Sequence, residues 1–125
     1  MSKQNKKQFG VWMDTHHATI VGRATEDDST FTVLGHAGNA GAEPNTSEKN
    51  EHNDGKTLQH KYFKEILALM VNAEDVHVTG TGVAQEQFMH YMADTPQFKN
   101  TVTAESTSNK MSEESLVSFI SEKFN

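Results

Sequence analysis

The sequence predicts one α/β domain, in which an antiparallel hairpin opens a mixed sheet and helices then alternate with strands. Its length of 125 residues is close to the commonest size of a domain with one hydrophobic core. Apolar residues alternate with polar ones in some segments, as in strands, and recur every three or four residues in others, as in helices. The expected element order is β-β-α-β-α-β-α, with parallel pairing and right-handed crossovers in the second half.

Composition favours a small, soluble, cytoplasmic domain. Only 34% of the residues are apolar, and much of the polar excess lies in residues 1–8 and 36–56. We expect a disordered basic tail at 1–8 and a single domain at 9–125. No segment approaches the roughly 20 apolar residues that span a bilayer, and no signal-peptide core follows the N-terminal charges.

The chain has no cysteine and a net charge of −6. Without cysteine, neither disulfides nor thiolate metal sites can form. The negative charge argues against tight non-specific binding to nucleic acid, which depends on a basic face. The N-terminal lysines still offer a local basic contact at Lys3, Lys6 and Lys7.

The first half of the chain predicts a hairpin and then a long loop. Residues 9–23 are rich in β-branched and aromatic side chains and predict one long strand, bulged near residues 15–17. A polar turn at 24–29 leads to a second strand at 30–34, which makes an antiparallel hairpin. Residues 36–56 have no periodicity. Such a long polar loop within a compact domain is usually functional or disordered.

The second half alternates helical patterns with short strand patterns. The expected elements in chain order are a helix at 57–73, a strand at 75–81, a helix at 83–93, a strand at 99–104 and a helix at 113–124. Asp94 and Thr95 end the middle helix, because the residue before Pro96 is disfavoured in the helical region. Ser112 is expected to cap the last helix.

The histidines do not show the spacing of a metal site. His16 and His17 are adjacent in the expected first strand, so their side chains should point to opposite faces. His77 alternates with core positions and should face the other side of the sheet. We therefore expect structural or surface roles for the histidines, and neither a metal nor another cofactor.

Gly80, Thr81 and Gly82 follow an expected parallel strand and precede a helix. In open α/β sheets, ligands bind at this position, and the amides of a helix N-terminus can hold an anion. The triplet lacks the later glycine of a dinucleotide fingerprint. A tight turn is therefore the first interpretation, and a turn that binds a ligand or a protein partner is the alternative.

Two carboxylates give an enzymatic alternative. Asp14 lies in the first expected strand and Glu105 at the end of the fourth. Carboxylates at strand ends can bind magnesium for phosphodiester hydrolysis. This hypothesis, a divalent-metal-dependent phosphodiester hydrolase, requires the two carboxylates to converge within about 5 Å.

Several short segments resemble a known family. They are residues 10–14 with 18–21, residues 76–84, Gln87 with Phe88, and residues 103–106 with 110–112. Together they resemble small bacterial relatives of the archaeo-eukaryotic peptide-chain release factors. They look most like the central domain that these factors share with the ribosome-rescue protein Pelota. The resemblance covers roughly residues 9–124 and implies an RNase H-like α/β fold.

The sequence departs from the release-factor pattern in the long loop. In release factors this loop carries Gly-Gly-Gln, which enters the peptidyl-transferase centre and helps to position the hydrolytic water. The corresponding residues here are 35–41, and Gly-Gly-Gln occurs nowhere in the chain. The resemblance therefore implies a contact site rather than a catalytic one, with His36, Gly38, Asn39 and Gly41 as its candidate binding residues.

We expect a non-enzymatic, translation-associated domain that contacts the ribosome or a tRNA. Pelota-type domains also lack the tripeptide and act on ribosomes without hydrolysing the ester, which agrees with this expectation. Other hypotheses are the metal-dependent hydrolase and a protein-interaction module built on the Gly80–Gly82 turn. Self-association through the exposed edge of the hairpin is also possible, because unpaired strand edges favour pairing.

Overall fold

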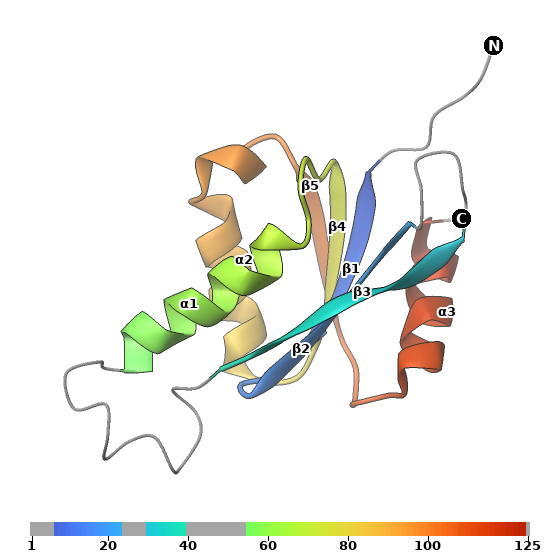
Figure 1. Cartoon of the computed structure of the whole chain (residues 1–125), viewed down its shortest axis with the longest axis horizontal. Coiled ribbons are helices and arrows are strands. Elements are labelled where there is room, and N and C mark those ends of the chain that lie inside the picture. Colours follow the sequence, from blue (N-terminus) through green and yellow to red (C-terminus); the bar gives the residue numbers. More distant parts are fainter. Residues whose placement is uncertain (1–6, 24–29, 40–54, 125) are drawn as a thin grey trace.

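The protein folds into a five-stranded mixed sheet with helices on both faces (Figure 1). The computed structural model describes residues 7–23, 30–39 and 55–124, with side chains from residue 58 onward in the last range. The elements are β1 (Gln8–Met13), β2 (His17–Arg23), β3 (Phe31–Gly38), α1 (Gly55–Ala68), β4 (Asp75–Gly80), α2 (Val83–Ala93), the short 3-10 helix η3 (Pro96–Phe98), β5 (Val102–Thr107) and α3 (Glu113–Phe124). The helices in these parts of the chain are not long and apolar enough to cross a membrane.

The strand order in the sheet is β3-β2-β1-β4-β5. β2 is antiparallel to both β1 and β3, whereas β4 is parallel to its neighbours β1 and β5. The chain thus opens with antiparallel hairpins and continues with helices that connect parallel strands. This confirms the predicted fold class, a mixed α/β sheet that opens with an antiparallel hairpin.

The prediction of one long strand over residues 9–23 is wrong, because β1 and β2 are separate strands that pair with each other. The chain reverses at Asp14, whose Oδ1 accepts hydrogen bonds from the backbone N–H groups of His16 (2.8 Å) and His17 (2.7 Å). An aspartate that bonds to the backbone two residues on is a common way to form a tight turn. The predicted bulge is therefore a complete reversal, and the sheet gains a fifth strand.

Other predicted boundaries differ by several residues. β1 begins at Gln8 and β3 continues to Gly38, so the ends of the predicted tail and loop belong to the sheet. α1 ends at Ala68, because i→i−3 bonds tighten its last turn and Asn72 adopts a positive φ of 59°. β5 starts three residues later than predicted, after the turn that contains η3. The bounds of α2 and α3 agree with the prediction.

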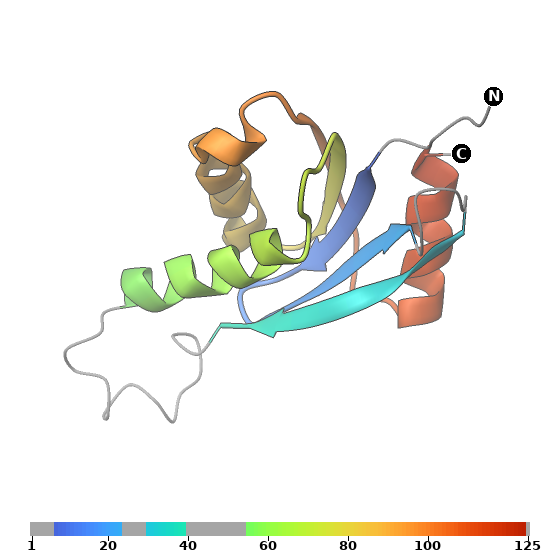
Figure 2. The same ribbon diagram turned by 45° about the horizontal axis from the view of Figure 1, so that its top comes forward.

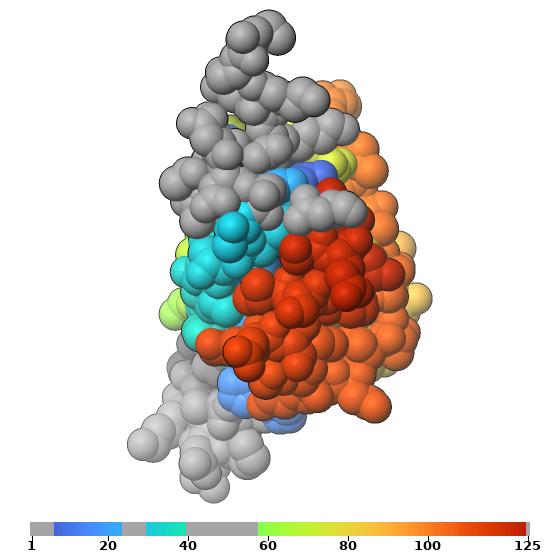
Figure 3. Space-filling view, turned by 90° about the vertical axis from the view of Figure 1, so that its right-hand side faces the viewer, coloured from blue at the N-terminus to red at the C-terminus, as the bar shows by residue number. Residues whose placement is uncertain are grey.

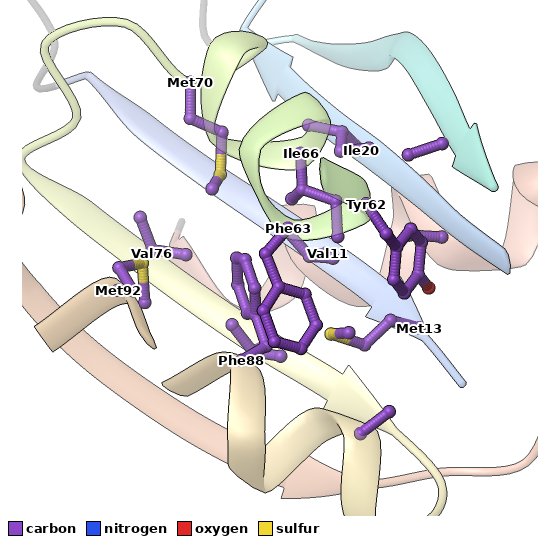
Figure 4. Packing of buried hydrophobic residues seen from close by; sticks show 14 of the residues in the cluster. Val11, Met13, Ile20, Tyr62, Phe63, Ile66, Met70, Val76, Phe88 and Met92 are labelled. Carbon is purple, nitrogen blue, oxygen red and sulfur yellow. The ribbon is translucent and has the colours of Figure 1, made fainter. Parts of the chain in front are cut away.

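The core has two parts, one on each face of the sheet. α1 and α2 cover one face and α3 covers the other (Figure 2). Beneath α1 and α2, Phe63 and Phe88 pack edge to face, and Val11 and Met13 of β1 lie in the same cluster (Figure 4). On the α3 face a smaller cluster contains Trp12, Val21, Phe31, Leu116 and Ile120.

Candidate functional site

Both segments that the sequence predicts as binding sites lie at the same edge of the sheet. β1, β4 and β5 are parallel, so their C-terminal ends lie together, with the start of β2 and the end of β3 beside them. We call this the strand-end edge and define it by residues 14–17, 36–39, 80–82 and 107–113. It lies at the bottom of Figure 1, where β1 turns into β2 and β5 leads into α3. Gly41, the remaining predicted binding residue, falls outside the described residues.

At this edge, Asn39 contacts the protein itself. Its side chain is only 5% exposed, and Nδ2 donates to the carbonyl of Thr15 at 3.0 Å. Its backbone N–H donates to the carbonyl of His16 at 2.9 Å. Tyr62 of α1 adds a third bond, from its hydroxyl to the carbonyl of Asp14 at 2.9 Å. Burial, followed by the nearby Asp14 charge, raises the pKa of Tyr62, so the hydroxyl keeps the proton that it donates. Asn39 therefore holds the β1–β2 turn in place.

The two predicted glycines of the Gly80–Gly82 turn have different surroundings. Gly80 has a φ of 147°, and a Cβ at this position would lie 1.9 Å from the carbonyl oxygen of Met13. Only glycine fits there, because the neighbouring strand end approaches too closely. Gly82 has a φ of 86° and caps α2, but no atom lies within 4 Å of its hypothetical Cβ. Thr81 is partly buried between them, and its N–H donates to the same Met13 oxygen at 3.2 Å. The structure therefore explains Gly80 as a packing requirement and leaves open space only at Gly82.

A groove of about 440 Å³ lies at the strand-end edge, between β1, β2 and β3 on one side and the beginning of α3 on the other. Its floor includes Trp12, which is 5% exposed and donates from Nε1 to the carbonyl of Asn109 at 3.2 Å. His36 also lines the groove, and its Nε2 lies 2.6 Å from Oε2 of Glu113, with both side chains more than half exposed. The other polar residues of the lining are His17, Thr19, Lys110 and Ser112.

The groove presents two imidazoles and one ammonium group beside a single carboxylate, over an apolar floor. His17 and the Lys110 ammonium group can donate hydrogen bonds to an anionic or polar ligand. Of these residues, His36 is a predicted binding residue, whereas His17, Lys110 and Glu113 are not. The missed residues carry no local signal, because His36 and Glu113 are 77 positions apart in the chain and meet only through the docking of α3 on β3.

The two carboxylates of the hydrolase hypothesis do not converge. Asp14 follows β1, and its carboxylate accepts backbone hydrogen bonds within its own turn. Glu105 lies inside β5, two strands away, and accepts a bond from Nε2 of Gln85 at 3.3 Å. The strand register places Asp14 about three residues beyond Glu105, hence roughly 10 Å along the strands in addition to two strand spacings. In the described parts of the chain, no three His, Cys, Asp or Glu side chains gather as metal ligands.

A chain of four polar side chains lies on the α3 face of β4 and β5. His77 Nε2 is 2.9 Å from the hydroxyl of Ser106, which donates to Thr79 at 3.0 Å, and Thr79 lies 2.7 Å from Ser108. His77 is 8% exposed and packs edge-on against Phe119 of α3. Burial lowers the pKa of His77, and the charge of Lys123 lowers it further. The expectation that His77 faces away from Val76 and Val78 is confirmed.

Among solved structures, the chain is similar to the crystal structure of the Pelota protein of Thermoplasma acidophilum. The match covers 93% of this chain with a TM-score of 0.60 and 18% sequence identity. It covers 32% of the Pelota chain, so this chain spans about a third of that protein's length. No protein-family model matches the sequence, and neither does any curated protein. The structure therefore supports a Pelota-like fold, as the short sequence motifs implied.

Proposed function

We propose that this chain is a translation-associated, cytoplasmic binding domain that contacts the ribosome or a tRNA. The observation that carries the proposal is the Pelota-like fold, which extends over 93% of the chain. Release factors and Pelota, which the sequence motifs also resemble, act on ribosomes. The proposed contact is the strand-end edge, because both predicted binding segments meet there.

The groove beside α3 supplies the contacting groups in this proposal. His17 and Lys110 offer nitrogen donors, whereas Nε2 of His36 already contacts Glu113. Most hydrogen bonds between proteins and nucleic acids are made to phosphate and sugar oxygens. The overall charge of −6 restricts favourable electrostatic contact to such local patches. Binding should therefore depend less on salt than in a protein with a broad basic face.

The proposed contact is not a hydrolytic one. The chain contains no Gly-Gly-Gln, which is the tripeptide that release factors place in the peptidyl-transferase centre. At the strand-end edge, Asp14 is engaged by backbone amides and Asn39 by the β1–β2 turn. We expect no release of peptide from peptidyl-tRNA above the uncatalysed rate, measured with purified ribosomal complexes.

Co-sedimentation with purified ribosomes, and binding of labelled tRNA in parallel, tests the proposal. Lys110→Ala should weaken binding and reduce the slope of log affinity against log salt by about one, because one phosphate contact is lost. Lys99→Ala is the matched control. Lys99 precedes β5, so it lies at the other ends of the parallel strands, away from the strand-end edge. The absence of binding to both ribosomes and tRNA would refute the proposal. Equal effects of the two substitutions would refute the groove as the contact.

A second variant tests the long loop. Ala37 is buried and Asn39 holds the turn, so a deletion that begins at Ala37 would damage the fold. Residues 40–53 should instead be replaced by a glycine-serine segment of equal length. Loss of binding would place the contact in this segment as well as in the groove, whereas full retention would restrict the contact to the groove.

A further inference from the structure

The outer strands of the sheet, β3 and β5, differ in how accessible they are for pairing with another strand. At the β3 edge, the register with β2 shifts between Ile20 and Val21, which leaves Leu34 as an extra residue in β3. Such a bulge twists an edge and discourages pairing. Both α1 and α3 also pack against β3, and Figure 3 shows α3 beside β3. The hairpin edge is therefore poorly suited to self-association.

The β5 edge has none of these protections. Its six residues contain no proline and no basic side chain, and its register with β4 has no irregularity. All but Ser106 are exposed, and Val102 is 64% exposed. Among the described residues, no strand pairs with the outer side of β5. Natural proteins rarely leave a regular edge strand of this length uncovered, because it is a template for pairing.

The hydrogen bonds to β4 show which backbone groups face outward. The N–H of Val102 donates to the carbonyl of Glu74 at 2.9 Å, and the N–H of Ser108 donates to the carbonyl of Gly80 at 3.0 Å. Because bonding directions alternate along a strand, the even-numbered residues of β5 face β4. The N–H and C=O groups of Thr103, Glu105 and Thr107 therefore point away from the sheet.

We propose that β5 pairs in antiparallel fashion with β5 of a second copy of this chain, with the two-fold axis at Ala104. In a symmetric pair, outward-facing residues must lie opposite one another. An axis at Ala104 places Thr103 opposite Glu105 and pairs five residues of each strand. An axis at Glu105 would oppose two carboxylates, which is destabilising, and an axis at Thr103 would pair only three strand residues.

Side chains on the α3 face fit the same register. In an antiparallel pair, residues opposite each other without mutual hydrogen bonds approach to about 4.5 Å between Cα atoms. Ala104 would occupy this position in both copies, and its small side chain permits the approach. Val102 would lie opposite Ser106 of the second copy, which would cover part of its exposed surface. The pairing would join two five-stranded sheets into one sheet of ten strands.

Light scattering coupled to size exclusion tests the proposal across micromolar to millimolar concentrations. The wild-type chain should reach twice its mass of 13.9 kDa, and Ala104→Lys should return it to that mass, because two ammonium groups would oppose each other at the axis. Thr32→Lys is the matched control at an exposed position of the β3 edge and should leave the dimer intact. A wild-type monomer at every concentration would overturn the proposal. Dissociation by Thr32→Lys and not by Ala104→Lys would place the pairing at the β3 edge instead.

Hydrogen exchange gives a second readout that does not depend on a substitution. The amides of Thr103 and Glu105 should exchange at least tenfold more slowly in concentrated than in dilute protein. The amides of Ala104 and Ser106, which already face β4, should change little in comparison. Equal slowing of both sets, or no slowing, would contradict pairing through β5.

Discussion

Substitution of Gly80 by alanine tests whether the Gly80–Gly82 turn is primarily structural. The new Cβ would lie 1.9 Å from the backbone oxygen of Met13, which has no rotamer through which to move away. A φ of 147° is also a region that side chains strongly disfavour, at a cost of roughly 1–3 kcal/mol. Relief of the overlap by a backbone shift adds about 1–3 kcal/mol. We therefore expect Gly80→Ala to lower the free energy of unfolding by roughly 2–6 kcal/mol.

Gly82→Ala isolates the backbone contribution to this loss. Gly82 has φ 86° and ψ −175°, also a region that is essentially reserved for glycine, but a Cβ there would meet nothing within 4 Å. Its substitution should cost only the strain of roughly 1–3 kcal/mol. The difference between the two variants therefore measures the overlap with Met13.

Urea unfolding followed by circular dichroism measures both variants. With a slope of about 2 kcal/mol per molar urea, the midpoint should fall by about 2 M for Gly80→Ala and about 1 M for Gly82→Ala. An equal or smaller loss for Gly80→Ala would show that the close approach of β1 and β4 is not what requires glycine. The structural interpretation of the Gly80–Gly82 turn would then lose its main support, and the alternative interpretation as a binding turn would be favoured.

Three further predictions concern individual contacts in the fold. Tyr62→Phe removes the hydroxyl that bonds to the Asp14 carbonyl and should cost about 1–2 kcal/mol of unfolding free energy, measured by urea titration. The pKa of His77 is lowered from 6.5 in the folded state, so the unfolded chain binds a proton first. The stability that this residue contributes is therefore present above pH 6.5 and declines as the pH falls below it, and His77→Gln should flatten that decline in thermal melts. Gly10→Ala would place a Cβ 2.2 Å from Cδ1 of Ile120, so its cost of about 1–3 kcal/mol should shrink in an Ile120→Ala background, as a double-mutant cycle would show.

Local signals in the sequence were sufficient to predict the bounds of α2 and α3. Gly82 opens α2, and the residues before Pro96 end it, as the sequence indicated. Ser112 caps α3 through a bond from the N–H of Ser115 to its hydroxyl at 3.1 Å. Each of these signals acts within about four residues, so neighbouring sequence contains the whole cause.

The opening strands depend on partners that are remote in the sequence. His36, Ala37 and Gly38 look like loop residues, yet they form strand because Thr19, Ala18 and His17 of β2 pair with them. Periodicity also failed at the β1–β2 reversal, where four residues without an apolar side chain looked like a bulge. Tertiary pairing therefore overrides local preference in this part of the chain.

The candidate site, like the fold, could be predicted only in part from the sequence. The position of the glycine turn at a strand end followed from topology alone, since parallel strands in an open sheet present their C-terminal ends together. The groove did not follow, because its lining combines β1, β2 and β3 with the start of α3. No pattern within a single segment encodes that contact.

The two proposed surfaces occupy different parts of the sheet, and this makes them separable by experiment. The groove lies at the strand-end edge beside α3, whereas β5 lies at the far side of β4. In an antiparallel pair through β5, the strand-end edges of the two copies would lie at opposite ends of the joined sheet, and both grooves would remain open. Ala104→Lys should therefore abolish the dimer while ribosome co-sedimentation at dilute concentration stays within about twofold, and Lys110→Ala should do the reverse. If Ala104→Lys removed both properties, contact through a single groove would be too weak alone, and the binding would require two copies.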